Sequence, residues 1–320
     1  MERLTLPGTT LSVSPICMGL GGFGARIRGA EAERLLATYL EQGGNFVDTA
    51  HCYACWIPDA GAGSSERALG ECLRSLGARE QVVIGTKGGH TAFGEGYPRP
   101  DAFLAPERIA LDLAESLERL QTEQIELYYL HRDDPRVPVG EIMDALNRHI
   151  QARAIREIAA SNWSEARMDA ANAYAAERGL RPFVASQVQW SLATPAREIG
   201  PDPTTRYVLP ETAAWHTRTG MPIIAYSSAA GGFFADPPRV SAQYDTPVNH
   251  ARRDRAHALA AELGATPTQV ALAYLRAQAF PVVPILGTVN RDHLLEELGA
   301  ASLRLTTAQA AWLEGGEKRL

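Results

Sequence analysis

The chain has few cysteines, no long hydrophobic run and no excess of positive charge. Its four cysteines among 320 residues are too few and too scattered for a disulfide scaffold. No apolar stretch is long enough to span a bilayer, and residues 1–8 lack the hydrophobic segment of a signal peptide. The net charge of −6 argues against nucleic acid or an anionic membrane as the main partner. We therefore expect a soluble, cytoplasmic protein.

What the chain does contain is a regular alternation of strand-like and helix-like segments after a short N-terminal hairpin. Pro106 and Pro267 open helical patterns, a position where the missing N–H of proline is harmless. Gly77 and Gly179 stand where such patterns end. The strand segments are apolar on both faces, as in parallel strands that helices cover.

This alternation predicts an α/β protein with a closed (β/α)8 barrel, and an open doubly wound sheet is the alternative. Because no repeat, low-complexity tract or linker interrupts it, residues 1–320 are expected to form one domain. The expected strands are 16–20, 45–49, 81–86, 125–130, 155–159, 183–188, 222–226 and 282–286. The expected helices are 30–42, 64–76, 106–120, 138–151, 164–178, 208–219, 251–263, 267–278 and 291–298.

Four polar residues stand at or just after the ends of three successive strand segments. Asp48 is near the end of 45–49 and Tyr53 lies in the next loop, while Lys87 and His131 directly follow 81–86 and 125–130. In a parallel barrel these strand ends converge on one rim, where barrel enzymes carry their chemistry. The pattern therefore predicts that a carboxylate, a phenol, an ammonium and an imidazole meet there.

These four groups suit proton transfer to a carbonyl oxygen. A phenol titrates near pH ~10, and a nearby ammonium such as that of Lys87 favours its ionised form. A buried lysine needs a carboxylate partner, which Asp48 would supply. His131 would then orient a substrate carbonyl while Tyr53 protonates it.

Each of the four residues also has an ordinary interpretation. Asp48 alone would be a cap or loop residue, Tyr53 a rim aromatic with a hydrated hydroxyl, and Lys87 a solvated loop residue. His131 alone would donate to a backbone carbonyl. Their joint placement at neighbouring strand ends favours the catalytic interpretation over these.

Seven short motifs follow one another along the chain. They are Asp48-Thr49-Ala50-His51-Cys52-Tyr53, Gly85-Thr86-Lys87, Tyr129-Leu130-His131-Arg132-Asp133-Asp134, Ala160-Ser161-Asn162-Trp163, Gln187-Val188-Gln189-Trp190-Ser191, Ala225-Tyr226-Ser227 and Pro284-Ile285-Leu286-Gly287-Thr288. In their order and spacing the sequence resembles the aldo-keto reductase superfamily over almost its whole length. The resemblance implies a (β/α)8 barrel that holds a nicotinamide dinucleotide without a Rossmann domain. It implies Tyr53 as general acid, Lys87 and Asp48 as the pair that tunes it, and His131 as the group that orients the carbonyl.

The expected cofactor site continues around the same rim. Ser161, Asn162 and Gln187 would bind the nicotinamide carboxamide, and Tyr226 would stack on the ring. Helix capping by Ser161-Asn162 and core packing by Tyr226 are the ordinary alternatives. The remaining expected contacts are Gly22, Ser227, Ser228, Ala229, Gly232, Gly287, Thr288, His293 and Glu297.

The sequence departs from the family pattern where the adenosine half of the cofactor is expected. Asn290 stands where family members often carry an arginine, and Glu296-Glu297 replaces a Gln-Asn or Glu-Asn pair. A 2′-phosphate needs a cation, which Arg291 or His293 would have to supply, whereas a carboxylate suits a free ribose diol. We expect NADP(H) as the family default, with NAD(H) as the alternative.

The remaining candidate features lie in the loops of the same rim. Cys52-x-x-Cys55, with His51, His90 and His131, is a candidate zinc set, but a structural zinc site usually has two close pairs. We therefore expect no metal site and two loop cysteines beside the pocket. We expect Trp56 and Trp163 to wall the substrate pocket, with ordinary loop packing as the alternative.

Three functions compete at this point. The leading one is NAD(P)H-dependent reduction of a small aldehyde or ketone, sugar-like carbonyls included, with no nucleic acid or membrane partner. The second is a regulatory subunit that binds a nicotinamide cofactor and turns over little. The third is a metal-dependent barrel hydrolase.

Overall fold

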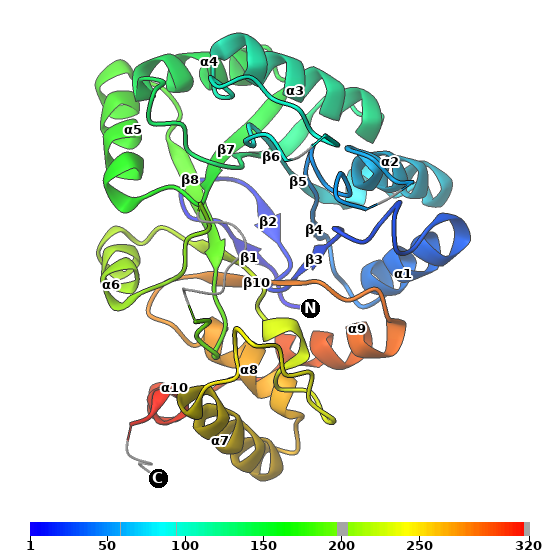
Figure 1. Ribbon diagram of the computed structural model, residues 1–320, viewed down its shortest axis with the longest axis vertical. Coiled ribbons are helices and arrows are strands. Elements are labelled where there is room, and N and C mark those ends of the chain that lie inside the picture. Colours follow the sequence, from blue (N-terminus) through cyan, green and yellow to red (C-terminus); the bar gives the residue numbers. More distant parts are fainter. Residues whose placement is uncertain (58, 94, 197–203, 317–320) are drawn as a thin grey trace.

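The computed structural model describes residues 1–57, 59–93, 95–196 and 204–316. Among these residues, eight parallel strands close into a barrel in the order β10-β3-β4-β5-β6-β7-β8-β9 (Figure 1). The predicted (β/α)8 barrel is therefore confirmed, and the open doubly wound sheet is excluded. The strands are β3 (Cys17–Gly19), β4 (Phe46–Asp48), β5 (Val83–Gly88), β6 (Ile125–Leu130), β7 (Ile155–Ser161), β8 (Phe183–Gln189), β9 (Ile223–Tyr226) and β10 (Val282–Leu286).

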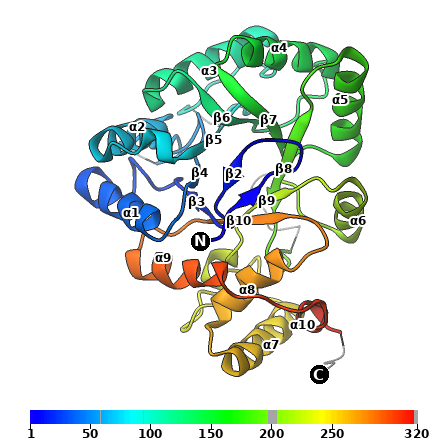
Figure 2. The ribbon, with the colours of Figure 1, turned by 180° about the vertical axis from the view of Figure 1, so that it is seen from behind.

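Helices form the outer layer of the barrel, as the view from behind also shows (Figure 2). Their apolar faces pack on the outward side chains of the strands in one large buried cluster, and a second cluster lies beneath α7 and α8. The helices are α1 (Gly29–Glu41), α2 (Ser64–Leu76), α3 (Pro106–Leu120), α4 (Val139–Gln151), α5 (Glu165–Arg178), α6 (Pro210–Thr219), α7 (Pro247–Leu263), α8 (Pro267–Arg276), α9 (Arg291–Leu298) and α10 (Thr307–Glu314). Short 3-10 turns are η1 (Arg79–Gln81), η3 (Ala230–Gly232) and η4 (Gly299–Ala301).

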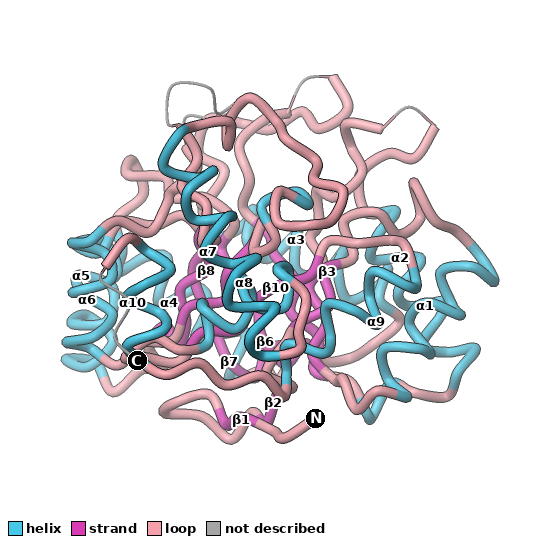
Figure 3. The backbone as a smooth tube through the Cα atoms, turned by 90° about the horizontal axis from the view of Figure 1, so that it is seen from below, coloured by secondary structure: helices cyan, strands magenta, loops and turns pink. Residues whose placement is uncertain are grey.

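An antiparallel hairpin closes one end of the barrel. It consists of β1 (Leu4–Thr5) and β2 (Ser12–Val13), and Leu6, Leu11 and Val13 join the side chains that fill the barrel interior. The hairpin lies at the end opposite the long loops (Figure 3). One mouth of the barrel is thus sealed with apolar residues, and polar chemistry is left to the other mouth.

Local signals set most helix boundaries where the sequence predicts them. Pro106 and Pro267 occupy the first helical turn, and Thr266 forms a capping box with Gln269. Gly77 and Gly179 end α2 and α5 with φ of 59° and 63°, a left-handed conformation that glycine adopts without steric cost. Within the described residues, no helix combines the length and the apolarity needed to cross a membrane.

The predictions are wrong mainly near the C-terminal half of the barrel. Helix α7 begins at Pro247 rather than at residue 251, and α10 is not among the predicted helices. The segment between β9 and α7 is therefore shorter than the predicted strand 222–226 and the predicted helix 251–263 leave between them. The prediction also does not single out the described parts of the connection between β8 and α6, residues 190–196 and 204–209.

Candidate active site

Strand register brings the predicted polar residues to the same rim. Asp48 is paired with Gly85, and Lys87 with Tyr129, so the ends of β4, β5 and β6 lie at adjacent levels. The amide of His131, the residue after β6, donates to the carbonyl of Gly88 at the end of β5. This stagger places the three side chains around one point.

Lys87 is the centre of the predicted group. Its Nζ donates to Asp48 Oδ1 at 2.5 Å, to the Tyr53 hydroxyl at 3.0 Å and to the carbonyl of Thr49 at 2.7 Å. The lysine is 1% exposed, as is Asp48, so the ion pair is removed from water. A buried pair of this kind holds because each charge is fully hydrogen-bonded.

Gln187 completes the shell of Asp48. Its Nε2 donates to Asp48 Oδ2 at 2.8 Å, so both carboxylate oxygens have a donor. Gln187 is predicted to bind the nicotinamide carboxamide, and its bond to Asp48 is not predicted, because the two residues are 139 positions apart in sequence. Gln187 therefore connects the group around Lys87 with the expected cofactor side.

The expected acidification of Tyr53 is not what the structure indicates. Burial raises the pKa of Tyr53 to about 12, although the neighbouring Lys87 acts to lower it. Burial by itself lowers the pKa of Lys87, but Asp48 and Tyr53 outweigh it and hold that pKa above its usual range. Tyr53 is therefore a protonated donor at neutral pH, next to a permanently charged ammonium.

His131 is buried and neutral. Burial, followed by the nearby His90 and Arg132, holds its pKa well below the usual range. Its ring packs edge-on against that of Tyr53, with centroids 5.9 Å apart. A neutral imidazole beside the Tyr53 hydroxyl can donate one hydrogen bond to a carbonyl oxygen.

His51, which precedes Cys52, points away from this centre. Its Nε2 lies 2.6 Å from Glu115 Oε2 and its Nδ1 lies 2.8 Å from the Tyr97 hydroxyl. These bonds tie the loop after β4 to α3 and to the loop after β5. His51 thus holds the loop that carries Tyr53 and does not reach the substrate.

A cavity of about 380 Å³ opens above the group around Lys87. It contains Tyr53 and His131 together with Ser161, Asn162 and Gln187, so the catalytic and nicotinamide candidates share one space. Several of its walls, such as Phe93 and Thr205, are not among the predicted site residues, because nothing in their local sequence marks them. The full lining is Cys52, Tyr53, Trp56, His90, Phe93, His131, Arg132, Ser161, Asn162, Gln187, Thr205 and Tyr226.

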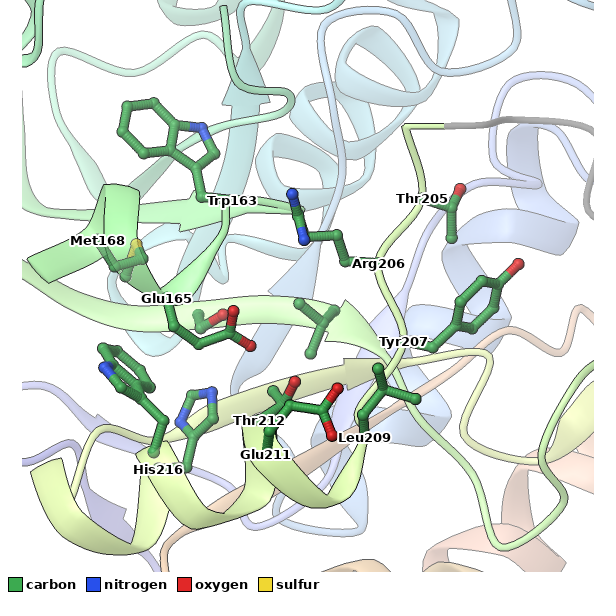
Figure 4. Close-up of a pocket in the computed structure, with 13 residues that line it drawn as sticks. Trp163, Glu165, Met168, Thr205, Arg206, Tyr207, Leu209, Glu211, Thr212 and His216 are labelled. Atoms are coloured by element: carbon green, nitrogen blue, oxygen red, sulfur yellow. The ribbon is translucent and has the colours of Figure 1, made fainter. Parts of the chain in front are cut away.

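The two tryptophans predicted to wall the pocket are in different places. Trp56 lines the Tyr53 cavity, is 44% exposed and contacts Phe93 with ring centroids 5.8 Å apart. Trp163 lines a separate cavity of about 410 Å³ between α5 and α6 (Figure 4). Its ring packs against that of Phe183. The interpretation of Trp163 as a wall of the Tyr53 cavity is therefore corrected. Thr205 lines both cavities, so its segment separates them.

The residues expected around the nicotinamide already bond to each other. Asn162, with φ of 61°, donates from Nδ2 to Ser161 Oγ at 2.9 Å. Its Oδ1 accepts from the Tyr226 hydroxyl at 2.8 Å. This arrangement fixes the ring of Tyr226 against the cavity, as stacking on a flat group requires.

The loop after β9 is a tight turn held by its own backbone. Ser227, Ala230, Gly231 and Gly232 all have positive φ, and the amides of Ala230 and Gly232 donate to carbonyls within the turn. Ser228 is turned inward, where its hydroxyl donates to the carbonyl of Ile285 at 2.7 Å. Ser228 therefore anchors the loop to β10, and only its backbone remains for a ligand.

The region after β10 combines open space with helix capping. A Cβ added at Gly287 would meet nothing within 4 Å, whereas one at Gly22 would lie 2.6 Å from Val289. Asn290, at the position where an arginine is common, caps α9 by accepting from the amides of Asp292 and His293. Thr288 bonds within the same turn.

Two charged residues of α9 are candidates for contacts with the adenosine ribose of the expected cofactor. Arg291, a candidate for a 2′-phosphate, donates from Nε to Thr38 Oγ1 on α1 at 3.3 Å. Among the described residues, Glu297 Oε2 is buried and has no hydrogen-bond partner. Burial, with Glu296 nearby, raises the pKa of Glu297 to about 8.

Sequence comparisons identify the family to which the chain is similar. A profile of the Aldo/keto reductase family matches residues 15–316. The chain is 28% identical to an aryl-alcohol dehydrogenase of Pestalotiopsis microspora, over 98% of this chain and 82% of the relative. It is 29% identical to probable aldo-keto reductase 1 of Glycine max, over 91% of this chain and 80% of that relative.

A solved structure shares the fold. The crystal structure of a thermostable aldo-keto reductase in complex with the inhibitor epalrestat superposes with a TM-score of 0.73. The match covers 98% of this chain and 99% of the other, at 22% sequence identity. At this identity the likeness concerns the fold alone.

Proposed function

Because the chain belongs to the aldo/keto reductase family, we propose that it is an NAD(P)H-dependent oxidoreductase that reduces an aldehyde or a ketone to an alcohol. The observation that carries the proposal is the position of Lys87, whose Nζ contacts both Asp48 and the Tyr53 hydroxyl at the floor of a cavity. His131 opens into the same cavity. These four residues are the proposed catalytic group.

In the proposed reaction Tyr53 delivers the proton. When bound, the reduced nicotinamide supplies the hydride to the carbonyl carbon. Tyr53 donates its hydroxyl proton to the carbonyl oxygen, and Lys87 stabilises the phenolate that remains. His131 holds the oxygen by a second hydrogen bond, and Asp48, held by Gln187, keeps Lys87 charged and in place.

The pKa of Tyr53 suits this direction. Because burial raises the pKa of Tyr53 to about 12, the residue carries its proton at neutral pH and is ready to donate it. The reverse reaction would need the phenolate, which is scarce at that pH. Tyr53 is therefore in the form that reduction requires at neutral pH, and the rate of alcohol oxidation should rise as the pH approaches about 12.

The residues of the rim fit a nicotinamide dinucleotide. Ser161, Asn162 and Gln187 would hold the carboxamide in the Tyr53 cavity, and Tyr226 would lie on the ring. The positive-φ turn after β9 would offer backbone N–H groups to the pyrophosphate.

On the adenosine side, we propose that NADH binds at least as tightly as NADPH. The buried Oε2 of Glu297 suits a ribose hydroxyl better than a phosphate, and Arg291 is engaged with Thr38. A 2′-phosphate would compete with Thr38 for the Nε–H of Arg291, whereas a free ribose diol makes no demand on this guanidinium.

The walls of the cavity support an aromatic carbonyl as substrate. Trp56 and Phe93 line the same cavity as Tyr53, and each is 44% exposed. Their two rings pack edge to face against each other. Partly exposed aromatic rings favour a flat apolar substrate over a sugar, whose hydroxyls would lose water there. One relative is named as an aryl-alcohol dehydrogenase, which agrees with this choice.

The test is cofactor consumption with aryl aldehydes, aliphatic aldehydes and aldoses, each with NADH and NADPH. We expect the highest kcat/KM with aryl aldehydes, and a loss of about 10²–10⁴-fold for Tyr53→Phe, since this removes the proton donor. Tyr174→Phe is a matched control, because Tyr174 on α5 donates to Asp144 on α4, outside the cavity. Full turnover in Tyr53→Phe would refute the assignment of the acid.

A further inference from the structure

Three potential metal ligands converge at one wall of the Tyr53 cavity. The Sγ of Cys52 and one ring nitrogen each of His90 and His131 all lie within 4.8 Å of one another, and all three residues are buried. They come from three loops or strand ends, after β4, after β5 and at the end of β6. Cys55, the other half of the cysteine pair in the sequence, is not part of the group.

The hydrogen bonds around the group hold the imidazoles in a form that binds metal. His90 Nδ1 lies 2.9 Å from the carbonyl of Thr91, so this nitrogen carries the proton and Nε2 is the ring nitrogen of the type that binds metal. Metal-binding histidines are typically oriented by such a carbonyl. His131 Nδ1 lies 3.5 Å from Cys52 Sγ, and the rings of His90 and His131 are 4.7 Å apart at 79°.

The donor set selects one class of cation. A thiolate and two imidazoles suit a borderline-soft divalent ion such as Zn²⁺ and are poor ligands for Mg²⁺ or Ca²⁺. Three protein ligands leave a fourth tetrahedral position, as in catalytic zinc sites. All three side chains line the Tyr53 cavity, so this fourth position faces the space where the carbonyl is expected.

We propose that Cys52, His90 and His131 form a binding site for a divalent cation of the zinc class, and that its occupancy inhibits carbonyl reduction. As the metal–sulfur bond forms, the thiol of Cys52 releases one proton to solvent, and no electron is transferred. The ion takes a lone pair of His131 and fills the space beside Tyr53. Inhibition is therefore competitive with the carbonyl substrate.

Local charges limit how tightly the ion binds. Lys87 and Arg132 both act on His131 as positive charges, and they also repel a cation. The thiolate supplies one negative charge to offset the ion. A site of this balance suits reversible binding better than permanent structural metal.

The binding half of the proposal is independent of catalysis and is tested with Co²⁺ as a spectroscopic probe. A tetrahedral Co²⁺–thiolate site gives a sulfur-to-cobalt charge-transfer band together with visible d–d bands. We expect both at one ion per chain, displaced by Zn²⁺. Cys52→Ser should abolish the charge-transfer band, and His90→Gln should weaken Co²⁺ binding by more than about 100-fold.

Two matched variants control for the other thiols. Cys55→Ser removes the nearest cysteine in sequence and Cys72→Ser a buried cysteine of α2, and both should keep the band. A band that is absent from the wild type, that survives Cys52→Ser or that disappears in Cys55→Ser would overturn the site. Zn²⁺ protection of Cys52 from alkylation, mapped by peptide mass in the wild type, gives the same answer without a variant.

The inhibition half rests on the proposed function, and the measurements separate the two. We expect Zn²⁺ to raise the KM for the aldehyde and to leave kcat unchanged. Co²⁺ bands without any reductase activity would refute the proposed function and leave the site in place. Stoichiometric binding with no effect on KM would refute inhibition.

Discussion

The rim of the barrel has two halves that use their residues differently. Over β4 to β6, the charged side chains of Asp48 and Lys87 are buried and bonded to each other. Over β9 and β10, the proposed cofactor site offers mainly backbone, with Ser228 turned inward and Asn290 used as a helix cap. The comparison shows where side-chain substitutions should lower stability and activity most. The first half depends on paired side-chain charges, whereas the second depends on the conformation of the backbone.

The sharpest test of this contrast is Lys87→Met. It leaves the buried Asp48 carboxylate without its partner, which is expected to cost about 3–5 kcal/mol in the free energy of unfolding. Carbonyl reduction should fall by about 10²–10³-fold or more, because a preorganised charge beside Tyr53 is lost. Urea denaturation and steady-state kinetics measure both effects.

Arg304→Met is the matched control for this loss of a cation. Arg304 and Glu2 are 57% and 85% exposed, so their ion pair is expected to contribute about 0–1 kcal/mol. Equal stability losses in the two variants would show that burial does not set the cost.

Gln187 connects the two halves, and Gln187→Leu should affect both. The loss of a hydrogen bond to the buried Asp48 carboxylate is expected to cost about 1.5–3 kcal/mol of stability. Dissociation of NADH, followed by fluorescence, should be faster because the carboxamide loses a partner.

Gln189→Leu, two residues further along β8, separates the charge effect from general packing. Gln189 donates to the neutral hydroxyl of Tyr244 at 2.9 Å, so its loss is expected to cost about 0.5–1.5 kcal/mol. The affinity for NADH should stay the same. If Gln189→Leu were as harmful as Gln187→Leu on both measures, Gln187 would have no special role.

A pH-dependent effect is expected in the cofactor half, at Glu297. A glutamate in an unfolded chain titrates near pH ~4.3, whereas burial raises the pKa of Glu297 to about 8 in the fold. A raised folded pKa means that the stabilising contribution is complete below the unfolded pKa and is lost as the pH rises to about 8. Stability without cofactor should therefore decline across this window, and Glu297→Gln should flatten the decline.

The control for Glu297→Gln is the neighbouring Glu296→Gln, followed by urea denaturation at about pH 5 and about pH 9. Any flattening should be weaker, because Glu296 is only the secondary cause of the shift at Glu297. An unchanged pH profile in Glu297→Gln would mean that this carboxyl is not buried in solution.

Much of the fold follows from local signals. The strands 125–130 and 282–286 have the predicted bounds, because a short apolar run between turn or helix signals favours a buried strand. Helix boundaries at Pro106, Gly77 and Gly179 depend only on backbone geometry within a few residues. Helix α7 is missed at its start because Pro247 lies in a stretch dominated by turn residues.

The candidate site divides in the same way. The sequence by itself determined that Asp48, Tyr53, Lys87 and His131 would share a rim, because parallel strands in a barrel bring their ends together whatever the details of packing. It also determined the family, which the profile match over residues 15–316 confirms.

Only the tertiary structure decided the rest. Whether Tyr53 is acidified depends on the balance between burial and the charge of Lys87, and burial outweighs it. The bond of Gln187 to Asp48, the departure of Trp163 to its own cavity and the meeting of Cys52 with His90 and His131 depend on loop paths and strand stagger. These contacts join residues that are far apart in sequence, so local propensities do not predict them.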